Sequence, residues 1–593
     1  MAGRGTDVDS ATVSDQAATP RLARLVDPRA LKWHAAALLV LLLAFIPALD
    51  NGVVGLPDEG AYAAQAANLG DGSWVGPLVA PEIDQTGERT AVVTSILTDN
   101  GTIPYGRQPL YPLVLTPAFV AGGLAGMMVV SLLGTWAAAL AGSAIARLLD
   151  PRMGIPALWL IGLGSPLFFD AYLIVGHSLV AAAVGVAAFG LLRAGGFGMK
   201  PRPTWLLVAI PAAATAVLIR SEGVLATGLL GVIGAVCALR WAHRRVSVDW
   251  SQFLASVSVG AIAVAAYTIN GVWSTAITGG ANTGGGDLIR QTDPLNVVWV
   301  SLIRPWTGDN RQASVAMALV VVATAGGAIT LRFLPDRPLL PVALLLLAAA
   351  GAVVRLFEVP DLVSGLLACT PILILGWVLL PAPTAWSRAI WLLAGTSVST
   401  AALIVWTTYG DGGATEWGGR FFHVILPLAV PVALVGVFRA LSPMARGARI
   451  LTAISIAVTA AALSTAAFLT LNRYHDAARA VVTGTNAFVA ERADDDTPIV
   501  LYAPLSPSGS SRLFWDAAAN SGVVLNADNI GGAAELLERI ADSGRDQAFI
   551  LTTVDVSMFE GLTSHSPDFA GWKISSSRRL HGSSNTVIEL DRR

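Results

Sequence analysis

Charged residues are scarce in this sequence: Asp, Glu, Lys and Arg make up 13% of the 593 residues, against roughly 25% in an average globular protein. So few charges cannot cover a water-facing surface for a chain of this length, which excludes an ordinary soluble protein. The formal net charge of −2 leaves no basic excess, so a nucleic-acid partner is not expected. Cysteine is also rare, because only Cys237 and Cys369 are present, both inside apolar runs. We therefore expect buried thiols and no disulfide framework.

In place of charge the sequence has hydrophobic residues, which make up 54% of it. They gather in runs of about 20 residues, the length at which a helix rising 1.5 Å per residue crosses the roughly 30 Å hydrocarbon core of a bilayer. The sequence therefore predicts a polytopic α-helical membrane protein with about thirteen transmembrane helices. The predicted spans lie near residues 31–49, 126–148, 154–170, 177–194, 205–220, 223–241, 252–273, 313–333, 339–357, 360–380, 387–409, 421–440 and 449–471.

The loops between these runs differ in charge. Alternate loops are rich in arginine and poor in acids, which by the positive-inside rule makes them cytoplasmic. Residues 1–30 are polar and lack hydrophobic periodicity, so we expect a disordered cytoplasmic tail. The opposite set of loops begins with the long, acidic segment 50–111. We therefore predict a multi-pass plasma-membrane protein whose N-terminus is cytoplasmic and whose functional residues lie on the outer face.

The composition changes again from about Asn472, and residues 472–593 are predicted to form an α/β domain. Strand-like runs at 499–502, 523–525, 549–552 and 586–590 alternate with helical patterns such as 532–540. The odd number of spans places this domain outside the cell, on the side opposite the N-terminus. Acceptor binding and assembly with a partner are both open roles for it.

An adjacent acidic pair, Asp58 and Glu59, follows the first predicted span. Good helix formers come next, so one interpretation is structural: Asp58 caps a helix and Glu59 complements the helix dipole in the first turn. The other interpretation is functional, because carboxylates a few residues beyond a membrane span lie where the head group of a lipid-linked substrate would sit. The spacing alone leaves both open.

Four segments, in order along the predicted membrane portion, carry a resemblance to a known family. They are the Asp58–Glu59 pair, RQPLYPLVL (107–115), SPLFFDAYLIVGHSL (165–179) and EWGGRFF (416–422). With these segments the chain resembles the GT-C superfamily of membrane glycosyltransferases, most of all its protein O-mannosyltransferase and aminoarabinose-transferase branch. Members take a sugar from a polyprenyl-phosphate carrier, and the resemblance implies an inverting transfer by single displacement.

The residue types in these segments suit that chemistry. A phosphate leaves as a stable anion, so one carboxylate suffices to deprotonate the acceptor hydroxyl, and Asp58 is the candidate base. Glu59 is expected to orient the acceptor or a divalent ion such as Mg²⁺, Mn²⁺ or Ca²⁺, and no other cofactor is expected. Charge on the departing phosphate calls for arginine, and the candidates are Arg420, Arg107 and Arg304. We further expect a substrate pocket lined by Tyr111, His177, Glu416 and His423.

A structural role is the alternative for each of these cations. An arginine near a span end often lies at the interface or in an ion pair, such as Arg220 with Glu222, and a lone histidine is often a hydrogen-bonded structural residue. If the functional interpretation holds, Asp58 and Arg420 should lie on opposite walls of one cavity.

The sequence thus predicts an inverting glycosyltransferase that moves a sugar from a polyprenyl-phosphate donor to an extracytoplasmic glycan, lipid or protein. Its expected partners are the lipid-linked sugar, membrane lipids and the acceptor. A transporter or flippase of lipid-linked saccharides is the alternative, and it predicts charged or Pro-broken positions near span centres and an internal repeat. A membrane scaffold that binds a partner through its C-terminal domain is a third possibility. Ionisable residues gather at one end of the spans, which favours the enzyme.

Overall fold

A computed structural model describes residues 30–592 of the chain apart from a set of internal segments. The segments that it does not describe are 50–51, 77–79, 86–88, 90–95, 99–100, 104–107, 243–244, 280–292, 305–310, 335, 338, 358–364, 408–416, 493–496, 503–514, 516–522, 528, 553–570 and 581–584. The predicted N-terminal tail, except its last residue, lies outside the described residues.

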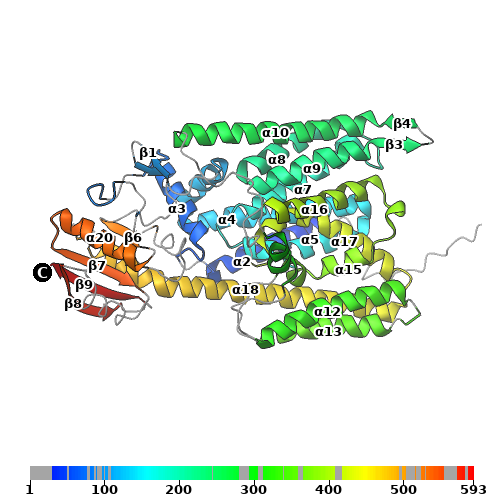
Figure 1. Cartoon of the computed structure of the whole chain (residues 1–593). Helices are drawn as coiled ribbons and strands as arrows, with labels where there is room; N and C mark the ends of the chain where they lie inside the picture. The colour runs from blue at the N-terminus through cyan, green and yellow to red at the C-terminus, as the bar shows by residue number, and fades with distance from the viewer. Residues whose placement is uncertain are drawn as a thin grey trace, which may run out of the picture.

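Helices that run side by side along one axis form the larger part of the molecule (Figure 1). Among the described residues, eight are long and apolar enough to cross a bilayer, and four apolar segments are shorter. The long set is α2 (Leu31–Leu49), α4 (Leu110–Leu149), α7 (His177–Gly195), α10 (Trp250–Thr278), α12 (Arg311–Phe333), α16 (Arg388–Thr407), the 3-10 helix η6 (Arg420–Ile425) continued by α17 (Leu426–Leu441), and α18 (Arg446–Ala490). The shorter set is η3 (Pro203–Trp205) with α8 (Leu206–Ile219), α9 (Ser221–Cys237), α11 (Pro294–Val297) with the π-helix η4 (Val298–Ile303), and α13 (Leu339–Val354). The polytopic helical membrane fold is confirmed.

Two predicted spans are broken helices. Residues 154–170 form α5 (Gly154–Gly162) and α6 (Leu167–Asp170), and residues 360–380 contain α14 (Leu366–Cys369) and α15 (Ile372–Val378). Pro166 and Pro371 lie at the two breaks. The helices break there because proline lacks an N–H and pushes the preceding residue out of helical geometry. At these two places a predicted span is therefore made of two helices and not of one continuous helix. The remaining short elements are η2 (Pro151–Met153), η5 (Pro383–Ala385) and the hairpins β1 (Ile96–Thr98) with β2 (Gly101–Ile103) and β3 (Leu239–Ala242) with β4 (Arg245–Val248).

The C-terminal α/β domain is confirmed, and it is built on a five-stranded sheet of order β6-β5-β7-β9-β8. β5 (Ile499–Tyr502) is parallel to β6 (Val524–Ala527) and β7 (Gln547–Thr552), whereas β9 (Thr586–Arg592) is antiparallel to β7 and β8 (Trp572–Arg579). Helix α20 (Ile530–Asp542) buries Leu536 and Leu537 in the same core as strand residues Val500 and Ile550. The sequence did not predict β8, because its residues after Trp572 are mostly polar and exposed.

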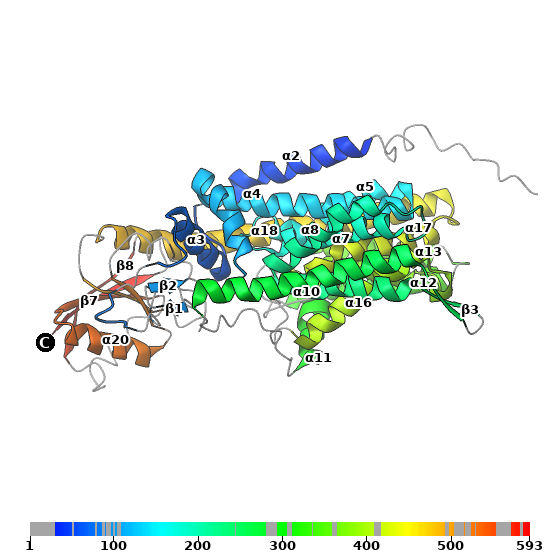
Figure 2. The ribbon, with the colours of Figure 1, turned by 90° about the horizontal axis from the view of Figure 1, so that it is seen from above.

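One helix joins the membrane bundle to this domain. α18 runs unbroken for 45 residues, so the predicted domain boundary at residue 472 falls inside it. At 1.5 Å per residue the helix is about 68 Å long, more than twice the hydrocarbon thickness. Its far end packs Phe488 into the core of the sheet beside Phe549. Figure 2 shows α3 (Pro57–Gly70) lying between the membrane bundle and the domain.

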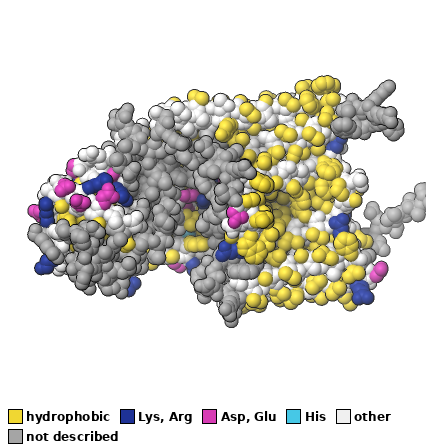
Figure 3. Space-filling model, in the orientation of Figure 1, with side chains coloured by type: hydrophobic (Ala, Val, Ile, Leu, Met, Phe, Trp, Pro, Cys, Tyr) yellow, Lys and Arg dark blue, Asp and Glu magenta, His cyan; other side chains and the backbone are white. Residues whose placement is uncertain are grey.

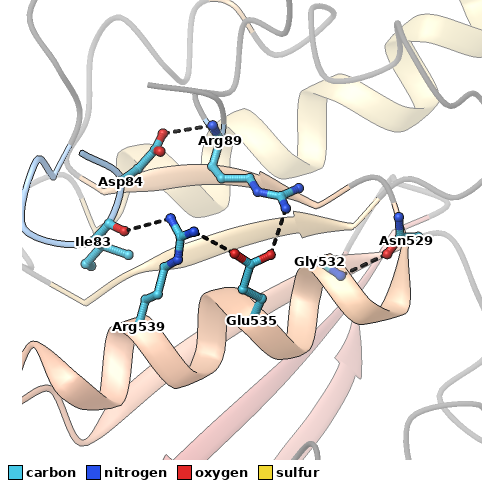
Figure 4. Close-up of polar contacts among 7 residues, drawn as sticks. All are labelled: Ile83, Asp84, Arg89, Asn529, Gly532, Glu535 and Arg539. Carbon is cyan, nitrogen blue, oxygen red and sulfur yellow. Dashed lines mark hydrogen bonds and ion pairs between the residues drawn. The ribbon is translucent and has the colours of Figure 1, made fainter. Parts of the chain in front are cut away.

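The segment after α3 is held on the C-terminal domain (Figure 4). Ile83 is buried in the core that contains Leu537. Arg89 Nη2 lies 3.0 Å from Glu535 Oε2, and its carbonyl accepts a hydrogen bond from the backbone N–H of Asn526 at 2.7 Å. Because α3 lies between the first membrane helix and this docked segment, the region that carries Asp58 is restrained by α2 on one side and by the domain on the other.

Candidate active site

Asp58 and Arg420 form an ion pair at the end of the membrane bundle nearest the C-terminal domain. Arg420 Nη1 donates to Asp58 Oδ2 at 3.0 Å, and the two side chains are 14% and 16% exposed, in that order. The residues are 362 positions apart in sequence. The structure thus brings together the two residues that sequence analysis ranked as base and phosphate-binding cation. It places them in direct contact; that they line opposite walls of one cavity stays a prediction.

The start of α3 explains the position of Asp58. Leu56 is the N-cap, with extended dihedral angles of φ −129° and ψ 149°. Pro57 takes the first helical position, where the lack of an N–H costs nothing and the fixed φ suits the helix. Asp58 follows in the first turn, where the positive end of the helix dipole attracts a carboxylate. Asp58 is therefore a first-turn acid and not the N-cap.

Glu59 is held by the backbone. Its Oε2 accepts hydrogen bonds from the N–H groups of Gly55 at 2.8 Å and Leu56 at 2.7 Å, and its Oε1 accepts one from Ile174 at 2.6 Å. The residue is 1% exposed. Both oxygens are thus engaged in fastening the start of α3 to the segment between α6 and α7. These contacts support a structural role for Glu59 in place of the predicted orientation of an acceptor or ion.

Two arginines approach the ring of Phe421. The guanidinium carbon of Arg420 lies 5.2 Å from the ring centroid and that of Arg220 lies 5.9 Å from it. Arg220 is buried and binds Glu222 through two contacts, Nε to Oε2 at 3.1 Å and Nη2 to Oε1 at 3.0 Å. The ion pair that sequence analysis offered as the structural alternative for Arg220 is therefore present. Its buried charge is compensated, and it supports the aromatic ring on which Arg420 lies.

The glycines before Arg420 adopt backbone conformations that other residues avoid. Gly418 has φ +81° and Gly419 has φ +64°. A Cβ on Gly418 would lie 2.3 Å from Pro166 Cγ, and one on Gly419 would lie 2.4 Å from the carbonyl oxygen of Ser301. This packing is not evident from the sequence. The two glycines let η6 begin close against η4 and the α5–α6 break, which sets the direction of the Arg420 side chain.

His423 lies one turn beyond Arg420 and is fully buried. Its Nδ1 lies 2.6 Å from Asp170 Oδ2, and both side chains are 0% exposed. The His177 ring is 6.3 Å from the His423 ring, centroid to centroid, and 5.9 Å from that of Phe421. The predicted pocket residues His177 and His423 are thus close together. Asp170 was not assigned as their partner, although an acid within an apolar segment is a signal that a partner exists.

Tyr111, the second residue of α4, is also part of this region. Its ring packs edge-on against Tyr62 at 4.7 Å between centroids, and the two side chains are buried. Tyr62 follows Asp58 by four residues on α3 and therefore lies on the same helix face. Tyr62 was not among the predicted site residues, although its four-residue spacing from Asp58 indicates it.

The other predicted residues are less closely tied to the site. Arg107 and Glu416 lie outside the described residues. Arg304 follows η4, and its carbonyl accepts a hydrogen bond from the N–H of Gly365 at 2.7 Å. It is three residues beyond Ser301, which packs against Gly419, so η4 brings Arg304 to the neighbourhood of the site.

In the described part of the chain, no three His, Cys, Asp or Glu residues lie together in a group able to hold a metal ion. A divalent ion at Asp58 or Glu59 stays a prediction. With both Glu59 oxygens bound to backbone N–H groups, Asp58 is the acidic side chain of the pair that is better placed for such an ion.

Similar proteins were found among solved structures. No protein-family model and no curated sequence matches the chain. Among solved structures, the chain is similar to ArnT from Cupriavidus metallidurans bound to undecaprenyl phosphate, at 13% identity and a TM-score of 0.48, over 97% of this chain and 98% of that one. It is also similar to the Archaeoglobus fulgidus oligosaccharyltransferase tethered with an acceptor peptide, at 11% identity and a TM-score of 0.45, over 89% of this chain and 69% of that one.

Proposed function

We propose that this chain is an inverting glycosyltransferase that moves a sugar from a polyprenyl-phosphate donor to a hydroxyl group on the outer face of the plasma membrane. The observation that carries the proposal is the Asp58–Arg420 ion pair. The chain brings a carboxylate and a guanidinium together from positions 362 residues apart, at the end of the membrane helices where a lipid-linked head group would lie. A helix-dipole role accounts for Asp58 alone, but it does not account for the arginine.

Donor binding exchanges one ion pair for another. A guanidinium binds phosphate oxygens with the same planar geometry that it offers to a carboxylate, so the donor phosphate competes with Asp58 for Arg420. Once Arg420 holds the phosphate, Asp58 is released toward the acceptor. The same arginine thereby couples donor binding to the availability of the base.

The transfer itself is a single displacement. The acceptor hydroxyl oxygen attacks the anomeric carbon from the face opposite the phosphate, and a new carbon–oxygen bond forms as the bond to the phosphate oxygen breaks. The electron pair of that bond leaves with the polyprenyl phosphate, whose charge Arg420 stabilises. Asp58 takes the proton of the hydroxyl and later passes it to water. The attack geometry inverts the anomeric centre.

The test measures transfer by purified protein in liposomes with a panel of radiolabelled polyprenyl-phospho-sugars, mannose and arabinose first. We expect Asp58→Asn to lower kcat by about 10²-fold or more, the usual contribution of general base catalysis, while the melting temperature stays close to that of the parent. Arg420→Gln should both raise KM for the donor and lower kcat, because it removes a contact made before and during bond breaking.

Asp71→Asn is the matched control, since Asp71 is exposed at the other end of the same helix and should leave kcat unchanged. Full transfer by Asp58→Asn would overturn the assignment of the base. Movement of the intact lipid-linked sugar across the liposome membrane without covalent transfer would instead support the flippase.

A further inference from the structure

A second feature of the membrane bundle lies away from the candidate active site. A cavity of about 850 Å³ opens between α2, α5, α17 and α18. Its walls are almost entirely apolar, and at one end Phe45 packs against Phe168 and Phe468 with centroid distances of 6.0 and 5.0 Å. Its size falls in the upper part of the roughly 300–1,000 Å³ range of small-molecule sites. We call it the α18 groove.

The opposite end of the α18 groove is basic. Arg152 and Arg449 line it, and both side chains are exposed to the surroundings. Arg152 turns Nε and Nη2 toward Asp150, with its closest contact at 2.7 Å, whereas among the described residues no carboxylate forms an ion pair with Arg449. The chain segments at this end, 147–153 and 439–449, contain five arginines and one acid, Asp150. A net positive charge therefore surrounds the mouth of an apolar groove.

The basic mouth and the candidate active site lie at opposite ends of the bundle. The unbroken helix α18 begins at Arg446, near the basic mouth, and farther along it His475 lies beside the start of α3, with its ring 3.1 Å from where a Cβ of Gly55 would be. Figure 3 shows one apolar face of the bundle with cationic side chains toward the end away from the C-terminal domain. A donor whose phosphate is at Arg420 therefore cannot also place that phosphate at Arg449.

We propose that the α18 groove binds an anionic phospholipid of the leaflet opposite the candidate active site. Its phosphate lies between Arg449 and Arg152, and its acyl chains run along α18 toward the phenylalanine cluster. The chemistry of the groove favours this occupant. Its apolar walls suit acyl chains, and its positively charged mouth suits an anionic head group. The head group of a zwitterionic lipid also carries a cation, which the five arginines would repel. The proposal does not depend on the enzymatic activity.

The test uses native mass spectrometry of the purified full-length protein with added phosphatidylglycerol or phosphatidylcholine of identical acyl chains. We expect phosphatidylglycerol to bind more tightly, and Arg449→Gln and Arg152→Gln each to reduce its affinity about fivefold, the effect of one arginine at an anionic head group. Arg439→Gln is the matched control, because Arg439 is exposed at the same end but does not line the groove. It should change the affinity much less.

A second pair of variants tests the hydrocarbon part. Ala461→Phe fills the groove from α18 and should lower binding of both lipids, whereas Val458→Phe on the same helix points outside the lining and should not. Equal binding of the two phospholipids, unchanged by the arginine variants, would overturn the proposal. The proposal would also be overturned if a polyprenyl phosphate displaced the bound phospholipid and its binding did not change in the Arg152 and Arg449 variants. The groove would then hold the chain of the carrier lipid.

Discussion

At the scale of single residues, the two neighbouring acids of α3 make different contacts. Glu59 accepts three backbone hydrogen bonds, from Gly55, Leu56 and Ile174, whereas Asp58 faces Arg420. A carboxylate that accepts several backbone N–H groups in a buried site is costly to replace, because each donor left without an acceptor keeps its desolvation penalty. Glu59 therefore holds the start of α3, which carries Asp58, in place.

We expect Glu59→Gln to destabilise the protein by about 1–3 kcal/mol, because the amide group presents an NH₂ to N–H donors that need an acceptor. Transfer per folded molecule should fall much less than in Asp58→Asn. Thermal unfolding and transfer rates measured on the same preparations separate the two effects. Glu491→Gln serves as control, since its side chain is 71% exposed. Loss of transfer at unchanged melting temperature would give Glu59 a catalytic role instead.

At the scale of elements, the start of η6 depends on two glycines, and a matched substitution separates strain from packing. Gly419 and Gly279 both have φ +64°, but a Cβ would meet Ser301 at Gly419 and open space at Gly279. Gly279→Ala should therefore cost about 1–2 kcal/mol of conformational strain alone. Gly419→Ala should cost more and should also lower transfer, because η6 and Arg420 must shift.

Melting temperatures and donor KM of the two variants check this expectation. Equal effects of the two substitutions on both quantities would mean that the contact with Ser301 does not position Arg420.

The elements also show what the sequence can and cannot indicate. Apolar length predicted most spans, and alternation predicted β5, β7 and β9 to within two residues. The break at Pro166 was missed because hydrophobicity continues through it. The helix α18 was ended too early because the composition turns polar after Asn472, although the helix continues to Ala490. Asp58 and Arg420 were identified from short segments, but their direct contact, and the pairing of Asp170 with His423, depend on tertiary packing that spacing does not encode.

At the scale of the whole molecule, ion pairs fasten the segment after α3 to the C-terminal domain. Arg545 binds Glu82 at 2.8 Å, and Arg539 and Arg89 both bind Glu535. The pKa of Glu82 is lowered below 4.5, mainly by a backbone hydrogen bond and secondly by Arg545. The pKa of Glu535 is lowered below the same value, mainly by Arg539 and to a smaller extent by Arg89. A carboxylate whose pKa is lower in the folded than in the unfolded state stabilises the fold when the pH is above its unfolded-state pKa. This stabilisation is lost as the pH falls through the folded-state pKa.

We therefore expect these contacts to be intact at neutral pH and to weaken progressively below about pH 4.5. The carboxylates are half-exposed, so each pair should contribute only about 0.2–1 kcal/mol, and high salt should reduce it. Melting temperatures between pH 3.5 and 7 should fall more steeply for the parent than for Glu82→Gln/Glu535→Gln. Glu538→Gln, exposed on the same helix, is the control and should follow the parent. If the melting temperatures of the parent and the double variant depended on pH in the same way, these ion pairs would not contribute to holding the segment after α3 on the domain.

The orientation of the molecule in the membrane decides whether the ion pair can meet an outer-leaflet donor. The arginine-rich segments 147–153 and 439–449 lie at one end of the bundle, and Asp58, Arg420 and the α/β domain lie at the other, so from the positive-inside rule we expect the domain outside the cell. With Cys237 and Cys369 replaced by alanine, a cysteine at Asp546, which is 81% exposed, should react with a membrane-impermeant maleimide on intact cells. A cysteine at the exposed Ala445 should react only in inside-out vesicles. The reverse pattern would put Asp58 at the cytoplasmic surface, and an outward-facing transferase would no longer be tenable, because base and acceptor would lie on different sides of the bilayer.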